Sequence, residues 1–242
     1  YQYVQGDSLY QANKIKGIAT LWVGKGLYSQ GTWRIPTNIT HITLGECLIG
    51  HGGPYAKAYG YLDIGRDSQL RTFTASNGFQ LSARDGMGRI GYQEGAGGFV
   101  DYLPTGVTFT VGSPTTNVAM SIPTSHGFYD THMTGTLALV NGTFRGYLDS
   151  LVIGSNTGYY GDNVGLLDLS SCAVQIGDEP NKVKLPTLIL AGCGGRGIYG
   201  GGGEQSTLRL PPSITQIVVG DLEIGNGGGA YCTRNNQGLL DL

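Results

Sequence analysis

Residues 35–45 read IPTNITHITLG, and the same phrase returns as LPPSITQIVVG at residues 210–220. The two copies align without a gap: Pro is second, and aliphatic residues stand first, fifth, eighth and tenth. A shorter copy, LPTGVTFTVG, occupies residues 103–112, and the opening recurs at Ile122-Pro123-Thr124 and Leu185-Pro186-Thr187. Pro fixes φ and lacks an N–H, so it re-aims the chain just before a strand. The phrase predicts repeated coils, each stopped at the same place.

A second repeat has the pattern aliphatic-x-x-aliphatic-x-aliphatic-x-x-Asn/Cys, for which chance predicts roughly 0.2 matches. The spacing between copies is 20 or 21 residues from Gly26 to Cys47, from Cys47 to Asp67 and from Cys172 to Cys193. That spacing lies in the band of leucine-rich repeats, whereas Asn156 to Cys172 is only 16 residues. The four strict matches are Ile39/Ile42/Leu44/Cys47, Leu148/Leu151/Ile153/Asn156, Val164/Leu167/Leu169/Cys172 and Leu185/Leu188/Leu190/Cys193.

The I-P-x-N-I-T-x-I-x-L-G phrase resembles the proline-led leucine-rich repeats of BspA-like bacterial surface proteins and is similar to the FNIP repeats of amoebae and giant viruses. The resemblance covers about half of the chain in short pieces, and residues 70–136 fit it poorly. The stretches GHGG, GAGG, GCGGRGIYGGGG and GNGGG resemble in composition the glycine-rich adhesin tips of phage tail fibres. These resemblances imply a right-handed parallel β-solenoid and an extracellular, cell-surface or virion-surface location.

Composition agrees with an all-β chain that has little or no helix. Of 242 residues 43 are Gly, and an internal Gly costs a helix about 1 kcal/mol relative to Ala. Hydrophobic residues make up 40%, which argues against disorder, and 13% are charged. We expect one elongated repeat domain over residues 1–242, with residues 70–136 as an insert or as degenerate coils.

Charge and hydropathy narrow the classes of partner. The net charge is −2 without a Lys/Arg cluster, which argues against nucleic acid. No run of 18 apolar residues is present, so we expect no membrane insertion. The chain begins at Tyr1 without Met, which indicates a removed leader or a fragment. Cys47, Cys172 and Cys193 fall at equivalent repeat positions, so we expect a ladder of buried thiols rather than disulfides, while Cys232 has no assigned place.

In a solenoid strand the residue between two inward aliphatic residues points outward. These middle residues are Trp22, Thr43, Asp63, Val152, Asp168, Ile189 and Val218. A face bearing an aromatic ring and carboxylates suits sugar binding, although it also suits a plain solvated wall. Tyrosines framed by Gly suit either a contact surface or packing against Gly. The predicted ligand-binding residues are Trp22, Asp63, Arg66, Asp168, Tyr159, Tyr160 and Tyr199.

Signals of catalysis are weak, and we expect no enzyme, no cofactor and no metal. The glycine pattern at residues 192–197 fits a phosphate loop, but the glycines at 200–203 leave no helix to follow it. His126, Asp130 and His132 lack further metal ligands nearby. Asp63, Asp149 and Asp168 could align on adjacent coils as glycosidase carboxylates.

Three functions follow, in order of preference. The first is a surface-displayed adhesin or receptor-binding module for a host cell-surface glycan or protein. The second is a structural fibre or coat component that assembles with copies of itself at an exposed solenoid end. The third is a glycan-processing enzyme on a β-solenoid.

Overall fold

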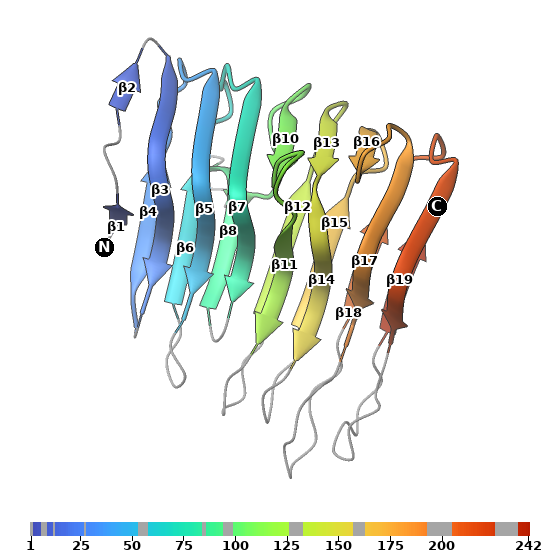
Figure 1. The fold of residues 1–242 in the computed structure, drawn as a ribbon. Helices are drawn as coiled ribbons and strands as arrows, with labels where there is room; N and C mark the ends of the chain where they lie inside the picture. Colours follow the sequence, from blue (N-terminus) through green and yellow to red (C-terminus); the bar gives the residue numbers. More distant parts are fainter. Residues whose placement is uncertain are drawn as a thin grey trace.

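Strands stacked in parallel dominate the computed structural model, which forms a β-solenoid of about six turns (Figure 1). The part of the chain that the structure describes contains no helix, which confirms the all-β solenoid expected from the sequence. The described residues are 2–5, 9–11, 13–26, 28–52, 58–83, 86–93, 99–125, 133–156, 163–192, 205–225 and 237–242.

One sheet, here called the long sheet, forms one wall of the solenoid. Its first three long strands are continuous, and the next three are each interrupted by a short excursion that divides the strand in two. In order, the strands are β3 (Lys14–Lys25), β5 (His41–His51), β7 (Thr72–Ala83), β10 (Thr108–Val111) with β11 (Val118–Ser125), β13 (Thr143–Gly146) with β14 (Leu148–Asn156), β16 (Ala173–Ile176) with β17 (Lys182–Leu190), and β19 (Gln216–Ile224).

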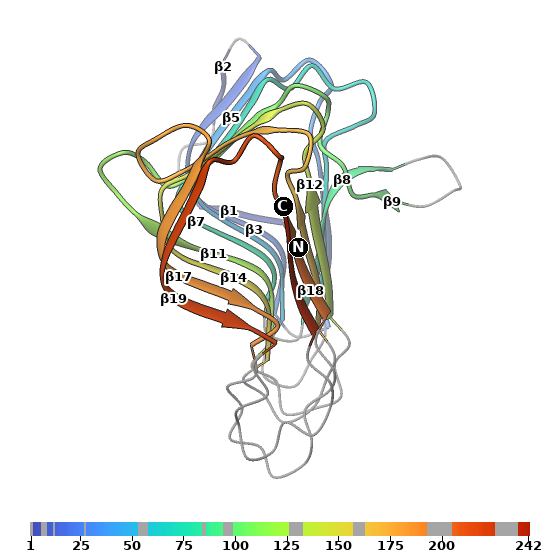
Figure 2. The same cartoon turned by 90° about the vertical axis from the view of Figure 1, so that its right-hand side faces the viewer.

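The opposite wall consists of two short sheets. The first contains β4 (Gln30–Arg34), β6 (Ala58–Asp63) and β8 (Gly86–Gln93), and β9 (Phe99–Val100) folds back antiparallel on β8. The second contains β12 (Met133–Ala138), β15 (Asn163–Asp168), β18 (Gln205–Arg209) and β20 (Gln237–Asp241). Viewed from the C-terminal end, the chain descends the long sheet, climbs the short sheets and advances toward the viewer, so the coil is right-handed (Figure 2).

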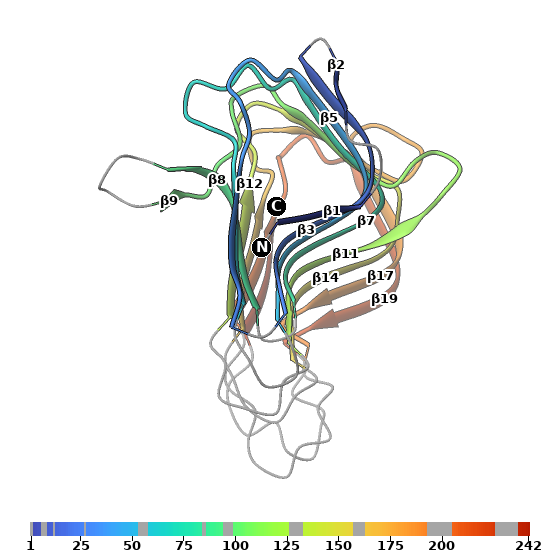
Figure 3. The same cartoon turned by 90° about the vertical axis from the view of Figure 1, so that its left-hand side faces the viewer.

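The first two strands differ from all the others in the long sheet, because they run antiparallel to their neighbour. β1 (Gln2–Gln5) pairs with residues 20–23 of β3, and β2 (Leu9–Gln11) pairs with residues 14–16. Both strands lie against β3 at the N-terminal end of the solenoid (Figure 3).

The repeat period predicted from the sequence is wrong. Register pairs Ile15 with Ile42 and Leu151 with Leu188, so one turn takes between 27 and 37 residues in these places rather than 20 or 21. The repeat over residues 164–172 lies on β15 and the turn after it, on the wall opposite the other three strict repeats. The 16-residue spacing before Cys172 therefore separates two walls of one turn.

The proline-led phrase marks one corner of the solenoid, where the short sheets lead into the next turn of the long sheet. The carbonyls of Pro36, Pro104 and Pro211 each accept a hydrogen bond from the N–H three residues later. Pro123 and Pro186 instead lie inside β11 and β17, so the two shorter matches are not copies of this corner.

Large apolar side chains fill the space between the walls. Phe73, Phe109 and Phe144 occupy successive rungs of the long sheet. The ring centroids of Phe73 and Phe109 lie 4.9 Å apart in stacked geometry, and those of Phe109 and Phe144 lie 6.2 Å apart. The rings are fully buried and continue the column that Ile42 begins.

Opposite the phenylalanine column, at the ends of the long strands, the two walls touch backbone to backbone. A Cβ on Gly60 would lie 2.1 Å from the carbonyl oxygen of Val23, and one on Gly88 would lie 2.0 Å from that of Ile49. Gly165 repeats the contact against Ile122, where the corresponding distance is 2.6 Å. These positions therefore exclude any side chain, and part of the glycine excess is structural.

Ser82 joins the two short sheets where the ladder between β8 and β12 is interrupted. It is fully buried with φ of +60°, the conformation that Gly50 adopts one rung earlier. Its hydroxyl accepts a hydrogen bond from the Gly88 N–H at 2.8 Å and lies 2.6 Å from the carbonyl of Thr134, to which it donates. One hydroxyl thus bridges β8 and β12.

The expected thiol ladder is wrong, although both described cysteines are free and buried. Cys47 lies within β5, where its rung partners are Leu21 and Phe79. Cys172 lies in the turn before β16, so the two are not on one column. Burial raises the pKa of both thiols, so they are unreactive. Cys193 and Cys232 lie outside the described residues.

Candidate functional site

The predicted outward face does not form, because its residues lie on different walls. Trp22 belongs to β3 in the long sheet, whereas Asp63 and Asp168 belong to the two short sheets. The ring of Trp22 is half-buried and already in contact: the Nζ of Lys25 lies 3.6 Å from its centroid, and His51 meets its edge at 4.9 Å. One face of the indole is therefore occupied by a cation.

Asp63 has a structural role that its position explains. Its carboxylate is buried, with 4% of the residue exposed, and it accepts hydrogen bonds from Arg34 Nε at 2.9 Å and from the Gly65 N–H at 3.1 Å. The second bond shapes the turn that follows β6. Arg66 is the next residue in that turn, so Asp63 supports the backbone from which Arg66 projects.

Asp168 is similarly engaged. It accepts hydrogen bonds from the N–H and hydroxyl of Ser170, at 3.0 and 2.7 Å, and from Arg209 at 3.2 Å. Burial alone would raise the pKa of Asp168, but these bonds outweigh it and lower the pKa below its ordinary value. Asp149 lies on β14 in the long sheet, so the three carboxylates considered for glycoside hydrolysis do not align on adjacent coils.

Several predicted positions lie outside the described residues, namely Tyr159, Tyr160, Tyr199, His126, Asp130, His132 and most of the glycine pattern at 192–197. Among the residues that the structure does describe, no three His, Cys, Asp or Glu side chains gather in a way that would hold a metal ion. No helix in the same part of the chain is long and apolar enough to cross a membrane.

Arg66 lies in an open groove of about 520 Å³ at the proline-marked corner, which we call the tyrosine groove. It combines two phenol rings, one guanidinium, two hydroxyls and an apolar floor. Tyr102 is 49% exposed, and Arg66 is exposed beside it. The groove is lined by Arg66, Ser68, Tyr92, Tyr102, Leu103, Pro104, Thr105 and Val140.

An ion pair fixes the tyrosine side of this groove. After β8 the chain makes an excursion through β9, and Arg89 clamps its return by donating to both oxygens of Asp101, at 2.8 and 2.6 Å. Tyr102 follows directly and pairs as an isolated bridge with Ala138 of β12. The Leu103 N–H then donates to the Ala138 carbonyl, and the Leu103 side chain is buried. The backbone under Tyr102 is therefore tied to two strands.

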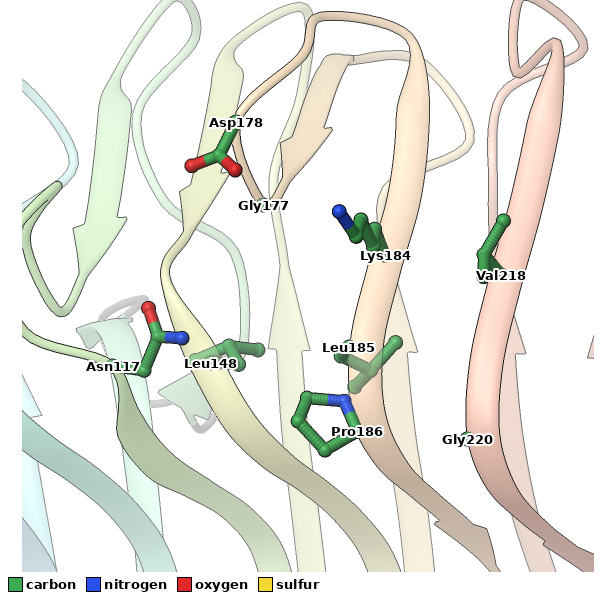
Figure 4. A pocket seen from close by; sticks show the side chains of 9 residues that line it. All are labelled: Asn117, Leu148, Gly177, Asp178, Lys184, Leu185, Pro186, Val218 and Gly220. Carbon is green, nitrogen blue, oxygen red and sulfur yellow. The ribbon is translucent and has the colours of Figure 1, made fainter.

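A second groove, of about 390 Å³, lies on the outer face of the long sheet and is called the lysine groove (Figure 4). Its rim carries Asn117, Asp178 and Lys184, and the Lys184 side chain points toward the loop that bears Asp178. Leu148 and Pro186 form part of an apolar floor. The remaining lining residues are Gly177, Leu185, Val218 and Gly220, and no aromatic ring is among them.

Of the predicted binding residues, the structure places Arg66 alone in either groove, and sequence reasoning missed Tyr92 and Tyr102. A signal for Tyr102 was present, because it directly precedes the proline-led phrase that begins at Leu103 and marks the corner. Tyr92 had no such signal, because the excursion that brings it to the corner has no counterpart in the other turns.

The fold defines the class of the protein, a parallel β-solenoid with one long and two short sheets. Comparison with known proteins adds no narrower assignment: no protein-family model matches the chain, and no curated protein and no solved structure matches it either.

Proposed function

We propose that this protein is a surface-displayed recognition module that binds a carbohydrate in the tyrosine groove. The observation that carries the proposal is the convergence of Tyr92, Tyr102 and Arg66 over an apolar floor at one rigid corner. Aromatic faces pack against the C–H faces of sugars, and a guanidinium donates hydrogen bonds in a fixed fork to hydroxyl or carboxylate oxygens.

Rigidity favours binding at this corner. Tyr102 is held through the Arg89–Asp101 ion pair and the bridge to Ala138, and the turn bearing Arg66 is held through Asp63. A preorganised groove loses little conformational entropy when a ligand binds. Tyrosine itself adds contact area with few rotatable bonds. A binder therefore fits the geometry better than an enzyme, since Asp63 and Asp168 are both occupied in structural hydrogen bonds.

The lysine groove is a weaker candidate for the same ligand. It offers Lys184 and Asp178 as hydrogen-bonding groups but no aromatic face, and its lining is mostly aliphatic. The two grooves lie on different parts of the molecule, so substitutions in one serve as controls for the other.

The test is glycan-array binding of the purified chain, followed by titration with the glycans that bind. Tyr102→Ala should weaken binding about tenfold or more, which corresponds to about 1.4 kcal/mol, because it removes one stacking face. Arg66→Ala should weaken binding and change the preference between acidic and neutral sugars. Lys184→Ala is the matched control and should leave the affinity unchanged.

The proposal fails if no glycan binds saturably, or if Lys184→Ala weakens binding while Tyr102→Ala does not. The second result would move the site to the lysine groove. Tyr102 is half exposed, so its substitution should leave the melting temperature close to that of the wild type.

A further inference from the structure

The C-terminal end of the solenoid exposes side chains that are buried everywhere else in the long sheet. Leu222 and Ile224 of β19 are 56% and 42% exposed. Their rung partners on β17, Leu188 and Leu190, are 1% and 0% exposed. The last rung therefore presents the continuation of the core, which lacks a covering rung among the described strands.

The edges at this end also lack the features that usually prevent strand pairing. Natural sheets protect their edges with Lys, Pro, bulges or a covering segment. The sequences of β19, QIVVGDLEI, and β20, QGLLD, contain no Lys, Arg or Pro. The opposite end differs, because antiparallel β1 and β2 cover much of the outer edge of β3. The solenoid therefore has one covered end and one open end.

The spacing of apolar residues in β19 is symmetric about the bond between Gly220 and Asp221. Residues 217 and 219 lie before that point, and residues 222 and 224 lie after it. In an antiparallel pair of two β19 strands centred there, Ile217 would oppose Ile224 of the other copy, and Val219 would oppose Leu222. Asp221 and Glu223 would oppose Gly220 and Val218, so like charges would not face each other.

We propose that two copies of this chain associate through their C-terminal ends, with β19 pairing antiparallel to β19 of the second copy. A surface that is open at one end of each molecule and complementary to itself closes as a two-fold dimer rather than growing into a fibre. Pairing would satisfy the free N–H and C=O groups of the edge and cover Leu222 and Ile224. This association is independent of the carbohydrate site.

The experiment is sedimentation velocity over a range of protein concentrations, in the absence of sugar. The wild type should sediment as a particle of twice the 25.5 kDa chain mass. Leu222→Lys/Ile224→Lys should raise the dissociation constant about a hundredfold or more, because four charges would meet in an apolar seam. Both side chains are exposed in the single chain, so its circular dichroism should be unchanged. Tyr28→Lys, at a residue 82% exposed elsewhere, is the control and should remain dimeric.

Hydrogen exchange provides a second measurement that does not depend on folding of the variant. Backbone amides of residues 216–224 in the wild type should exchange more slowly as concentration rises, while those of β5 should not change. A monomer at the highest soluble concentration would overturn the proposal, as would a dimer that survives the double substitution. A series of growing oligomers would overturn the closed two-fold arrangement.

Discussion

Arg209 lies between two carboxylates at the end of β18. It donates to Asp168 at 3.2 Å on one side, and its Nε lies 3.6 Å from Asp241 on the other. Register places the three residues on consecutive rungs of one short sheet. Arg34 and Asp63 make the same kind of pair on the other short sheet. Charges of alternating sign thus follow one corner of the coil and specify which rungs are neighbours.

This corner should make stability depend on pH through Asp168. Its pKa is lowered in the folded protein, so the ionised form contributes stability above the ordinary carboxyl pKa, and that contribution is lost as pH falls through the lowered value. Asp168→Asn should cost about 1 kcal/mol near neutral pH, a modest amount because Arg209 is partly exposed to solvent. Its destabilisation relative to wild type should shrink in acid.

Urea unfolding of both proteins at about pH 7 and about pH 3 measures this difference, since the other carboxylates are common to both proteins. An Asp168→Asn penalty that stays constant or grows in acid would show that the carboxylate is not stabilised by its partners. The same residue illustrates the limit of sequence reasoning: its outward position was inferred correctly as polar, but its partner Arg209 lies 41 positions away on the next rung.

At the scale of elements, the corner and the wall were predictable to different degrees. The proline-led phrase located three equivalent corners, because a fixed φ and a missing N–H act locally. The strand repeat was assigned the wrong period, because inward aliphatic spacing is the same on the long sheet and on β15. A local pattern does not distinguish two walls that face the same core. The excursion through β9, which completes the tyrosine groove, has no repeat to reveal it.

The contact between the walls predicts opposite behaviour for two glycines. Gly60→Ala should destabilise the protein by about 3 kcal/mol or more, because the new methyl would overlap the Val23 carbonyl and the Gly50 N–H, which are backbone atoms that cannot move independently. Gly106→Ala should cost only about 1 kcal/mol, because its φ of +81° is strained for Ala but nothing lies within 4 Å.

Denaturant melts of the two alanine variants check this contrast. Equal losses would mean that backbone conformation, rather than contact between the walls, determines the need for glycine. A well-folded Gly60→Ala protein with wild-type stability would show that the walls can separate at this rung.

For the whole molecule, the difference between its ends should control the size of assemblies. Deleting residues 1–12 removes β1 and β2 and uncovers the outer edge of β3, whose residues Ile15, Ile18, Leu21 and Val23 face the core. The shortened chain would then be open at both ends. We expect it to form assemblies larger than a dimer, because β19 of one copy could stack on β3 of the next as another rung.

Sedimentation of the shortened chain with and without Leu222→Lys/Ile224→Lys tests this expectation. The combined variant should return to smaller species, because one of its two sticky ends is charged. A shortened chain that remains dimeric at every concentration would indicate that β1 and β2 do not protect the edge of β3.

The excursion between β10 and β11 has a practical consequence. Residues 112–117 leave the long sheet after Val111 and rejoin it at Val118, while the flanking strands stay paired with their neighbours on both sides. Residues 114–117 are exposed, and the excursion is closed by hydrogen bonds between Ser113 and Thr116. Foreign peptides grafted at Thr115 would extend a loop that the coil already tolerates, which makes this solenoid a scaffold for displaying epitopes at a defined height along a rigid rod.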